Sequence, residues 1–248
     1  MDNTELINGK LGIYKKYKIA DLKVYMHIYY NHLLSYAKKY ECDWDGEADI
    51  TIDYPLEKYE KIRKEKFFAS MHMVEYMYSG MIFFRHLLFH SGMMLHASAV
   101  VLDKEAYLFS ANSGGGKSTH TKLWLDYFKD RAYILNDDKP LIRKVDGEWI
   151  AYGGPWSGKT DLSENKKAKL KSIVFVNKSS ENQIEKLSKK RAVGLVISQT
   201  QKRFYQEKLL VKVLDIVEKI TDDIPIYQMQ CDISTDAVEM AYNAIRRE

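Results

Sequence analysis

The residue pattern that points most clearly to chemistry is a glycine-rich segment that ends in Lys-Ser-Thr. Residues 107–119 read Y-L-F-S-A-N-S-G-G-G-K-S-T. Three consecutive glycines permit a tight turn, because glycine adopts backbone angles that a Cβ makes costly, and the N–H groups of such a turn form an anion site at the start of a helix. Lys117 can then reach phosphate oxygens, and the hydroxyl of Ser118 can ligate Mg²⁺. The segment therefore predicts a site for a polyphosphate.

The same segment departs from the strict phosphate-loop pattern at one position, where Ala111 replaces a glycine. A flexible glycine-serine linker is the alternative interpretation. The flanks argue against a linker, since residues 106–109 are apolar as in a buried strand and residues 123–128 place apolar side chains at helical spacing. We expect the following loop residues to bind nucleotide: Asn112, Ser113, Gly114, Gly115, Gly116, Lys117, Ser118 and Thr119.

Two adjacent carboxylates follow the next predicted strand. Asp137 and Asp138 come after residues 133–135 and a single asparagine. In a strand-loop-helix-strand unit, the second strand brings its carboxyl end beside the loop, at the ligand-binding edge of an open sheet. One aspartate there can hold Mg²⁺, and the other can accept the proton of an attacking hydroxyl. A helix cap or a turn before Lys139-Pro140 is the structural alternative.

Two further features allow both a functional and a structural interpretation. His96 lies in an apolar stretch, where a histidine more often packs in the core than takes part in catalysis. Residues 153–159 read G-G-P-W-S-G-K. This loop could bring Lys159 or a backbone N–H to a phosphate, with Trp156 and Ser157 beside it, or it could be a turn that Trp156 anchors.

Composition and charge limit the class of protein. The 248 residues are 46% hydrophobic and 29% charged, as is usual for a globular chain, and the net charge of +4 is spread in runs of mixed sign. The two cysteines match no metal or disulfide spacing, and the N-terminus does not resemble a signal peptide. The most apolar window, residues 81–95, contains Arg85 and two histidines and is not expected to span a bilayer. We expect a cytoplasmic protein with no nucleic-acid or membrane partner.

The elements that must position these residues fall into two regions. Residues 1–90 predict a small accessory α/β region, and residues 91–248 predict a strand-rich nucleotide-binding domain. In the first region we expect strands within 11–25 and 48–53, and helices at 30–40, after Pro55 and at 67–89. In the second region we expect strands at 93–101, 105–109, 133–135, 141–144, 149–152, 171–176, 183–187 and 225–230, and helices at 192–199, 208–220 and 235–246.

Taken together and in this order, the motifs resemble the catalytic domain of HPr kinase/phosphorylase and, more distantly, the ATP-dependent phosphoenolpyruvate carboxykinases. The resemblance is strongest to a bacterial HPr-kinase-related subgroup and covers about residues 93–200. It is carried by L-H-A-S-A at 95–99, G-K-S-T-H-T at 116–121, N-D-D-K-P at 136–140 and G-G-P-W-S-G-K at 153–159. It implies an α/β fold with a P-loop-containing mixed β-sheet core of the HPr kinase/PEP carboxykinase type, in which 91–248 form the catalytic domain and a small N-terminal α/β region is accessory.

The resemblance also implies roles for individual residues. Lys117 and Ser118 would bind the phosphates of ATP and Mg²⁺, which are the expected cofactors. Asp138 matches the base that accepts the proton of the acceptor hydroxyl, Asp137 would lie at the metal, and His96 would be an active-site residue. The two aspartates form a coupled pair, so their roles could be exchanged.

One departure from the family limits the substrate. The chain has no counterpart of the R-G-L-G segment of HPr kinases or of the metal-binding glutamate beside it, so the resemblance does not extend to HPr as the substrate or to the reverse reaction with inorganic phosphate. We expect a kinase that moves the γ-phosphate of ATP to a hydroxyl, such as a serine of a protein or peptide; a related branch acts on precursor peptides of natural products. A small-metabolite kinase, a carboxykinase-like lyase and a non-catalytic nucleotide-binding regulator are the alternatives. GTP or pyrophosphate as the donor, and a homo-oligomeric state, stay open.

Overall fold

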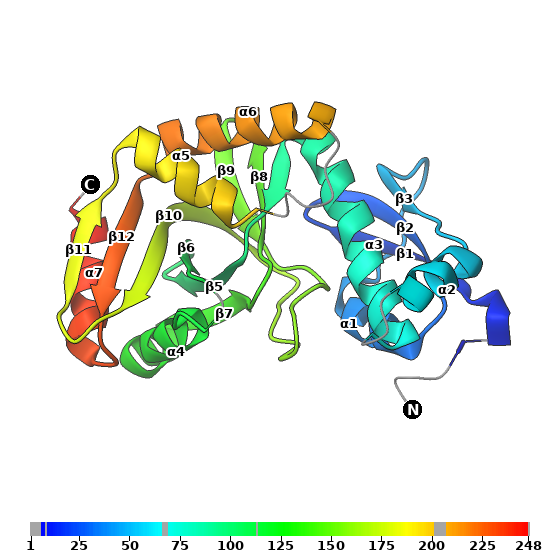
Figure 1. Ribbon diagram of the computed structural model, residues 1–248, viewed down its shortest axis with the longest axis horizontal. Coiled ribbons are helices and arrows are strands. Elements are labelled where there is room, and N and C mark those ends of the chain that lie inside the picture. The colour runs from blue at the N-terminus through cyan, green and yellow to red at the C-terminus, as the bar shows by residue number, and fades with distance from the viewer. Residues whose placement is uncertain (1–5, 8, 66–68, 113, 201–206, 248) are drawn as a thin grey trace.

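Two β-sheets with helices packed on them form a mixed α/β structure (Figure 1). The computed structural model describes residues 6–7, 9–65, 69–112, 114–200 and 207–247. In Figure 1 the smaller sheet and helices α1 to α3 lie at one end of the molecule, and the larger sheet lies between helices at the other end. Both sheets combine parallel and antiparallel pairing, so the α/β class is as expected.

The smaller sheet forms from a tight hairpin and a short third strand. Its order is β1-β2-β3, with β1 and β2 antiparallel and β2 and β3 parallel. Ala20 and Asp21 connect β1 to β2, and both have positive φ angles, of 52° and 60°, as a two-residue hairpin turn requires. The elements of this N-terminal unit are β1 (Ile13–Ile19), β2 (Leu22–Ile28), α1 (Asn31–Ala37), β3 (Ile50–Ile52), α2 (Leu56–Glu65) and α3 (Met71–Leu87).

The larger sheet has nine strands in the described part of the chain. Its main path runs β4-β8-β9-β10-β6-β5-β7, while β12 pairs with β10 and β11 pairs with β12. The long strand β10 is parallel to β6 and β12 and antiparallel to β9. The strands are β4 (Gly92–Met94), β5 (Ala97–Leu102), β6 (Glu105–Ser110), β7 (Ala132–Asn136), β8 (Leu141–Val145), β9 (Glu148–Tyr152), β10 (Lys167–Lys178), β11 (Gln183–Lys186) and β12 (Ile226–Cys231). The helices are α4 (Lys117–Phe128), α5 (Lys189–Ser198), α6 (Glu207–Asp223) and α7 (Thr235–Arg246).

Helices cover both faces of this sheet, which explains its continuously apolar strands. Along β5, Ala99 and Val101 share a core with α5 and α6, whereas Val100 and Leu102 share a core with α4 and α7. Figure 1 shows α5 and α6 on one side of the sheet and α4 on the other. Because alternate side chains point to opposite faces, a strand buried on both faces needs no polar residues.

A third cluster of buried apolar side chains joins the two sheets. It combines Met26 of β2 and Phe83 of α3 with Leu141 of β8, Tyr152 of β9 and Trp156. The division predicted near residue 90 falls between α3 and β4, and the segments on its two sides share this core.

The observed elements match the predicted ones for most of the chain and differ in a few places. The strand predicted at 93–101 is interrupted at Leu95 and His96, so that β4 pairs with β8 while β5 pairs with β6 and β7. The strand predicted at 171–176 is longer, because the first residues of β10 pair with β9. The helix predicted at 67–89 is α3, and residues 66–68 lie outside the described part of the chain.

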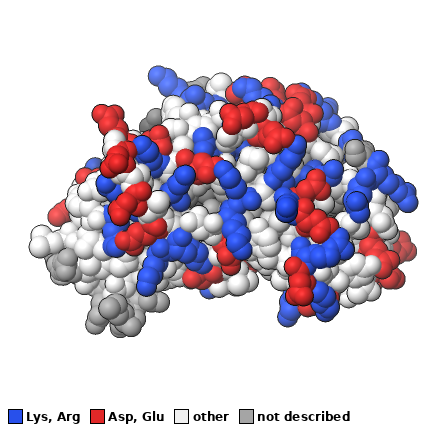
Figure 2. Space-filling view, turned by 180° about the vertical axis from the view of Figure 1, so that it is seen from behind, with Lys and Arg blue, Asp and Glu red and all other residues white. Residues whose placement is uncertain are grey.

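Charged side chains of both signs cover the surface. On the face shown in Figure 2, Lys and Arg side chains are interspersed with Asp and Glu. Some charged side chains of the protein are paired, as Lys144 is with Asp223 at 2.6 Å. Within the described residues, no helix combines the length and the apolar character needed to cross a membrane.

Candidate active site

The glycine-rich segment forms a turn between the end of β6 and the start of α4. Gly114 and Gly116 have φ angles of 75° and 102°, which residues with a Cβ rarely adopt. A Cβ on Gly115 would lie 2.7 Å from the Cβ of Ala111, too close for two carbons. The turn therefore requires all three glycines. Ser113, which was predicted to bind nucleotide, lies outside the described residues.

The N-terminus of α4 has the properties of an anion site. The amides of Lys117, Ser118 and Thr119 precede the first hydrogen bond of the helix, which the amide of His120 donates to the carbonyl oxygen of Gly116 at 2.9 Å. No side chain among the described residues caps this helix. The three amides and the positive end of the helix dipole suit a phosphate group.

Lys117 lies between the glycine turn and the two aspartates. Its Nζ is 3.3 Å from the carbonyl oxygen of Ala111 and 3.2 Å from Nε2 of His96. Burial lowers the pKa of this lysine, and the charges of Asp138 and Asp137 oppose the effect of burial. The structure thus places the predicted phosphate-binding cation next to the predicted carboxylates.

Asp137 is buried and contacts the first turn of α4. Its carboxylate accepts hydrogen bonds from the Ser118 hydroxyl, at 3.0 and 3.2 Å, and from the Thr160 hydroxyl at 3.4 Å. Nowhere in the described chain do three or more His, Cys, Asp or Glu side chains gather closely enough to hold a metal ion. The oxygen atoms of Asp137 and Ser118 nevertheless fit Mg²⁺, which usually takes one or two protein carboxylates and completes its shell with water and phosphate oxygens.

Asp138 lies beside a histidine and a lysine, in a backbone conformation that is unusual for a residue other than glycine. Its φ angle is 72°. One carboxylate oxygen, Oδ1, is 3.2 Å from Nε2 of His96, and the other, Oδ2, is 3.2 Å from Nζ of Lys139. Burial raises the pKa of this carboxyl, but the hydrogen bond with His96 and the charge of Lys139 outweigh burial and hold the pKa at about 2. The carboxylate is therefore ionised at neutral pH.

His96 connects the charged groups of the site. It lies between β4 and β5, where its backbone N–H donates to the carbonyl oxygen of Gln199 at 3.0 Å. Its Nδ1 is 3.1 Å from Oε1 of Gln199, and its Nε2 lies between Lys117 and Asp138. The Gln199 side chain also donates to Asn112 at 3.3 Å. The structure therefore brings His96, Lys117 and Asp138 together.

The loop at residues 153–159 is anchored in the protein core. Trp156 is only 1% exposed, and its ring stacks on Phe83 with centroids 4.8 Å apart. Ser157 is also buried and donates a hydrogen bond to an aspartate four residues further on. Of the two interpretations given above, the buried position of Trp156 favours a turn that Trp156 anchors. Lys159 is exposed beside the aspartates, where a substrate phosphate could reach it.

Sequence reasoning missed three residues that shape the site. Gln199 holds His96, and Thr160 donates to the buried aspartate. The hydroxyl of Tyr76 accepts a hydrogen bond from the amide of Gly158 at 2.9 Å, and a Cβ on Gly158 would lie 2.8 Å from the Cβ of Asp138. Thr160 follows the Ser-Gly-Lys triplet directly, so its position offered a signal. Gln199, which follows α5, and Tyr76 of α3 are distant in sequence and offered none.

A cavity of about 590 Å³ opens beside the aspartates. Residues 137–139 and 157–160 line the cavity together with side chains of α1 and α3. The carboxylates therefore border a space that a substrate could enter.

Comparison with known proteins identifies the family of the chain. The model of the family described as SynChlorMet cassette protein ScmC matches residues 62–242. The chain belongs to the ScmC family. Among solved structures it is similar to the Hpr(Ser) kinase/phosphatase from Coxiella burnetii, with 12% sequence identity and a TM-score of 0.36, over 60% of this chain and 91% of that chain. No curated protein matches it in sequence.

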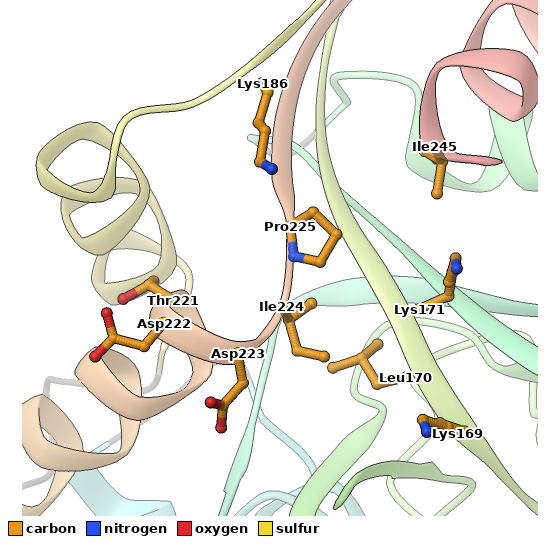
Figure 3. Close-up of a pocket in the computed structure, with 10 residues that line it drawn as sticks. All are labelled: Lys169, Leu170, Lys171, Lys186, Thr221, Asp222, Asp223, Ile224, Pro225 and Ile245. Atoms are coloured by element: carbon orange, nitrogen blue, oxygen red, sulfur yellow. The ribbon is translucent and has the colours of Figure 1, made fainter. Parts of the chain in front are cut away.

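A second cavity of this ScmC-family chain, of about 410 Å³, lies at the other end of the sheet strands (Figure 3). Lys169 and Lys171 of β10 and Asp223 at the end of α6 border it. These charges already have partners, since Lys169 pairs with Glu148 and Asp223 accepts from Lys144. Ligands of open α/β sheets bind at the carboxyl ends of parallel strands, and this cavity lies at the amino ends of β10 and β12. The glycine turn therefore marks the better candidate site.

Proposed function

We propose that the chain is an ATP- and Mg²⁺-dependent kinase that transfers the γ-phosphate to a hydroxyl group of a peptide, a protein or a small molecule. One observation carries the proposal: beside the start of α4, His96 contacts both Lys117 and Asp138. A lysine at a helix N-terminus can hold phosphate, and an ionised carboxylate can hold an acceptor hydroxyl. These are the two halves of a site for phosphoryl transfer. A protein that only binds nucleotide has no need of the second half.

In this proposal the first turn of α4 binds the nucleotide phosphates. The amides at the helix start and Nζ of Lys117 hold the β- and γ-phosphates. Ser118 and Asp137 would hold Mg²⁺, which when bound would neutralise charge that develops on the phosphate oxygens. The Thr160 hydroxyl fixes the orientation of Asp137.

Asp138 holds the acceptor hydroxyl in line with the γ-phosphorus. The bond from the acceptor oxygen to phosphorus forms while the bond from phosphorus to the bridging oxygen breaks, and the diphosphate leaves. Because the transition state is loose, the hydroxyl proton is lost late, so a carboxylate with a pKa of about 2 needs only to orient the hydroxyl and pass its proton on. Nε2 of His96, which is 3.2 Å from Oδ1 of Asp138, can receive that proton when the imidazole is neutral and carries its own proton on Nδ1.

The nucleotide half of the site is tested by binding. Lys117→Ala removes the phosphate cation and is expected to weaken MgATP binding about 10- to 10²-fold, since a hydrogen bond to a charged group is worth about 1.5–3 kcal/mol. Isothermal titration calorimetry on the full chain measures this change. Lys122→Ala changes an exposed lysine of the same helix and should leave the affinity unchanged. Equal affinities for Lys117→Ala and the unaltered protein would contradict the assignment.

The transfer half is tested with ATP labelled at the γ-phosphate. Asp138→Asn should retain MgATP binding and lower transfer by about 10²- to 10⁴-fold, the usual contribution of a positioned base. Proteins and metabolites of a bacterial lysate serve as acceptors, and mass spectrometry identifies those that gain phosphate. Asp126→Asn, an exposed position on α4, is the matched control. Transfer at the normal rate by Asp138→Asn would show that Asp138 is not the base.

A further inference from the structure

The cavity beside the aspartates has two walls of different chemistry. One wall carries the charged side chains of residues 137–139 and of Lys159. Asp138 and Lys139 pair with each other. The other wall belongs to the N-terminal unit, where α1 and α3 contribute aromatic, histidine and methionine side chains. These side chains are His32, Tyr36, Met73, Tyr76 and Met77.

The wall from the N-terminal unit is uncharged at neutral pH. Burial and the neighbouring His72 lower the pKa of His32 and outweigh the charge of Asp161, which raises it, so the imidazole is neutral there. Burial raises the pKa of Tyr36, which therefore keeps its proton. A phosphate or carboxylate on the body of an acceptor would meet only neutral side chains along this wall.

The same wall suits an apolar or aromatic group. The ring of His32 lies 4.7 Å from that of Tyr36 and 5.2 Å from that of Tyr76, and the two tyrosine rings are 5.4 Å apart. Packed aromatic rings adopt such separations. Met73 and Met77 line the cavity with these rings, and methionine side chains adapt to irregular apolar partners. A packed aromatic cluster with flexible methionines is typical of a site for apolar groups.

We propose that this cavity is the acceptor site, and that the acceptor carries its hydroxyl next to an apolar or aromatic group, as a serine in an apolar peptide segment does. The proposal rests on the kinase function proposed above. The hydroxyl reaches Asp138, and the apolar group packs on Tyr36, Met73 and Met77. The volume of about 590 Å³ is in the range of sites for whole small ligands, and a hydroxyl group alone would leave most of it unfilled.

Binding is tested without turnover, by NMR of the full chain with 13C-labelled methionine methyl groups. The probes are a blocked Phe-Ser-Leu peptide, a blocked Asp-Ser-Glu peptide and 2-phenylethanol, each at millimolar concentration with a non-hydrolysable MgATP analogue. We expect the signals of Met73 and Met77 to move with the apolar peptide and not with the acidic one. Met81, one helical turn beyond Met77 and not among the residues lining the cavity, should give an unchanged signal.

The other outcomes of this experiment also test the proposal. If the signals of Met73 and Met77 move only with 2-phenylethanol, the site still binds apolar groups, and its acceptor is a free alcohol rather than a peptide. No movement of Met73 or Met77 with any probe, or equal movement with the acidic peptide, would overturn the proposal.

Transfer to the same peptides gives an independent test. Met77→Lys places a charge on the apolar wall and should raise the KM for the apolar peptide by at least about tenfold, with unchanged MgATP affinity. Met81→Lys should change neither quantity. An unchanged KM in Met77→Lys would overturn the acceptor assignment. If the methyl signals move as expected and neither the peptides nor 2-phenylethanol gain phosphate, the apolar site stands and the kinase function fails.

Discussion

Among the single residues of the site, His96 has two alternative charged partners. Its Nδ1 is held by Gln199 at 3.1 Å, and its Nε2 is 3.2 Å from both Nζ of Lys117 and Oδ1 of Asp138. A neutral imidazole with its proton on Nδ1 can accept a hydrogen bond from Lys117 at Nε2, whereas an imidazolium donates from Nε2 to Asp138. One nitrogen cannot do both. In the proposed kinase, a proton that arrives from the acceptor therefore changes the contact made by the phosphate-binding lysine.

Replacement of His96 should change the titration of Asp138. The hydrogen bond from His96 is the first of the interactions that lower the pKa of this carboxyl against the effect of burial. A hydrogen bond to a charged group is worth about 1.5–3 kcal/mol, so His96→Asn should raise the pKa of Asp138 by about one to two pH units. NMR of 13C-labelled aspartate carboxyls measures the midpoint, and Asp138→Asn identifies the signal. An unchanged midpoint in His96→Asn would show that the contact with His96 does not stabilise the charge.

At the scale of elements, α3 supports the loop that holds Asp138. Gly80 of α3 lies against the ring of Trp156, and the same ring stacks on Phe83 one turn further along the helix. The Tyr76 hydroxyl accepts a hydrogen bond from the amide of Gly158, and Gly158 in turn packs against Asp138. A shift of this loop on the helix would therefore move the carboxylate that receives the acceptor.

Gly80→Ala should disturb this contact and lower stability. The added Cβ would lie 2.8 Å from Cδ1 of Trp156, and a buried indole ring cannot turn away. Overpacking of this kind costs about 1–3 kcal/mol in the free energy of unfolding, which urea denaturation measures. Transfer should fall as the loop shifts, while MgATP affinity stays the same.

Gly194→Ala in α5 is the matched control for that substitution. A Cβ on Gly194 meets no atom within 4 Å, and the position is exposed. Because alanine favours a helix over glycine, this variant should gain about 0.5–1 kcal/mol. A loss of stability in both variants alike would mean that the contact of Gly80 with Trp156 is not the cause.

What the sequence could predict at this scale was local. The glycine turn, its flanking strand and helix, and the aspartates after β7 each depend on residues close in the chain, and the structure has them where expected. Nothing in the sequence indicated the break between β4 and β5, because residues 93–101 are almost uniformly apolar. The two strands differ only in the strands with which they pair. The support of His96 by Gln199 joins residues 103 positions apart, a distance over which spacing predicts nothing.

At the scale of the whole molecule, the N-terminal unit is docked on the larger sheet by polar as well as apolar contacts. The hairpin turn between β1 and β2 receives hydrogen bonds from the larger sheet, with Arg143 donating to the carbonyl oxygen of Ala20 at 2.6 Å and the Tyr152 hydroxyl donating to Asp21 at 2.8 Å. Lys167 also pairs with Asp21 at 2.7 Å. The unit therefore contributes to the stability of the fold as well as to one wall of the cavity.

Within that unit, one buried carboxyl links the stability of the whole chain to pH. Glu75 of α3 is fully buried and accepts hydrogen bonds from the amides of Tyr29 and Tyr30, at 2.6 and 3.0 Å. Burial raises the pKa of this carboxyl from its ordinary value of 4.5 to about 8, although the two amides act in the opposite direction. Between these two values the folded chain holds a proton at Glu75 that the unfolded chain has released.

The free energy of unfolding should consequently fall as the pH rises from about 5 to about 8, with a contribution from Glu75 of at most about 1.4 kcal/mol per pH unit, and should level off above that range. Glu75→Gln removes the titration and keeps the size of the side chain, but its amide can accept only one of the two backbone hydrogen bonds. The variant should therefore be less stable than the unaltered protein near pH 5, by about 1–3 kcal/mol, and the deficit should shrink or reverse toward pH 8. Urea denaturation of both proteins across this range measures the difference, in which the contributions of other titrating groups cancel. A deficit that stays constant with pH would mean that Glu75 is ionised in the folded chain throughout the range, and that its two backbone amides outweigh burial.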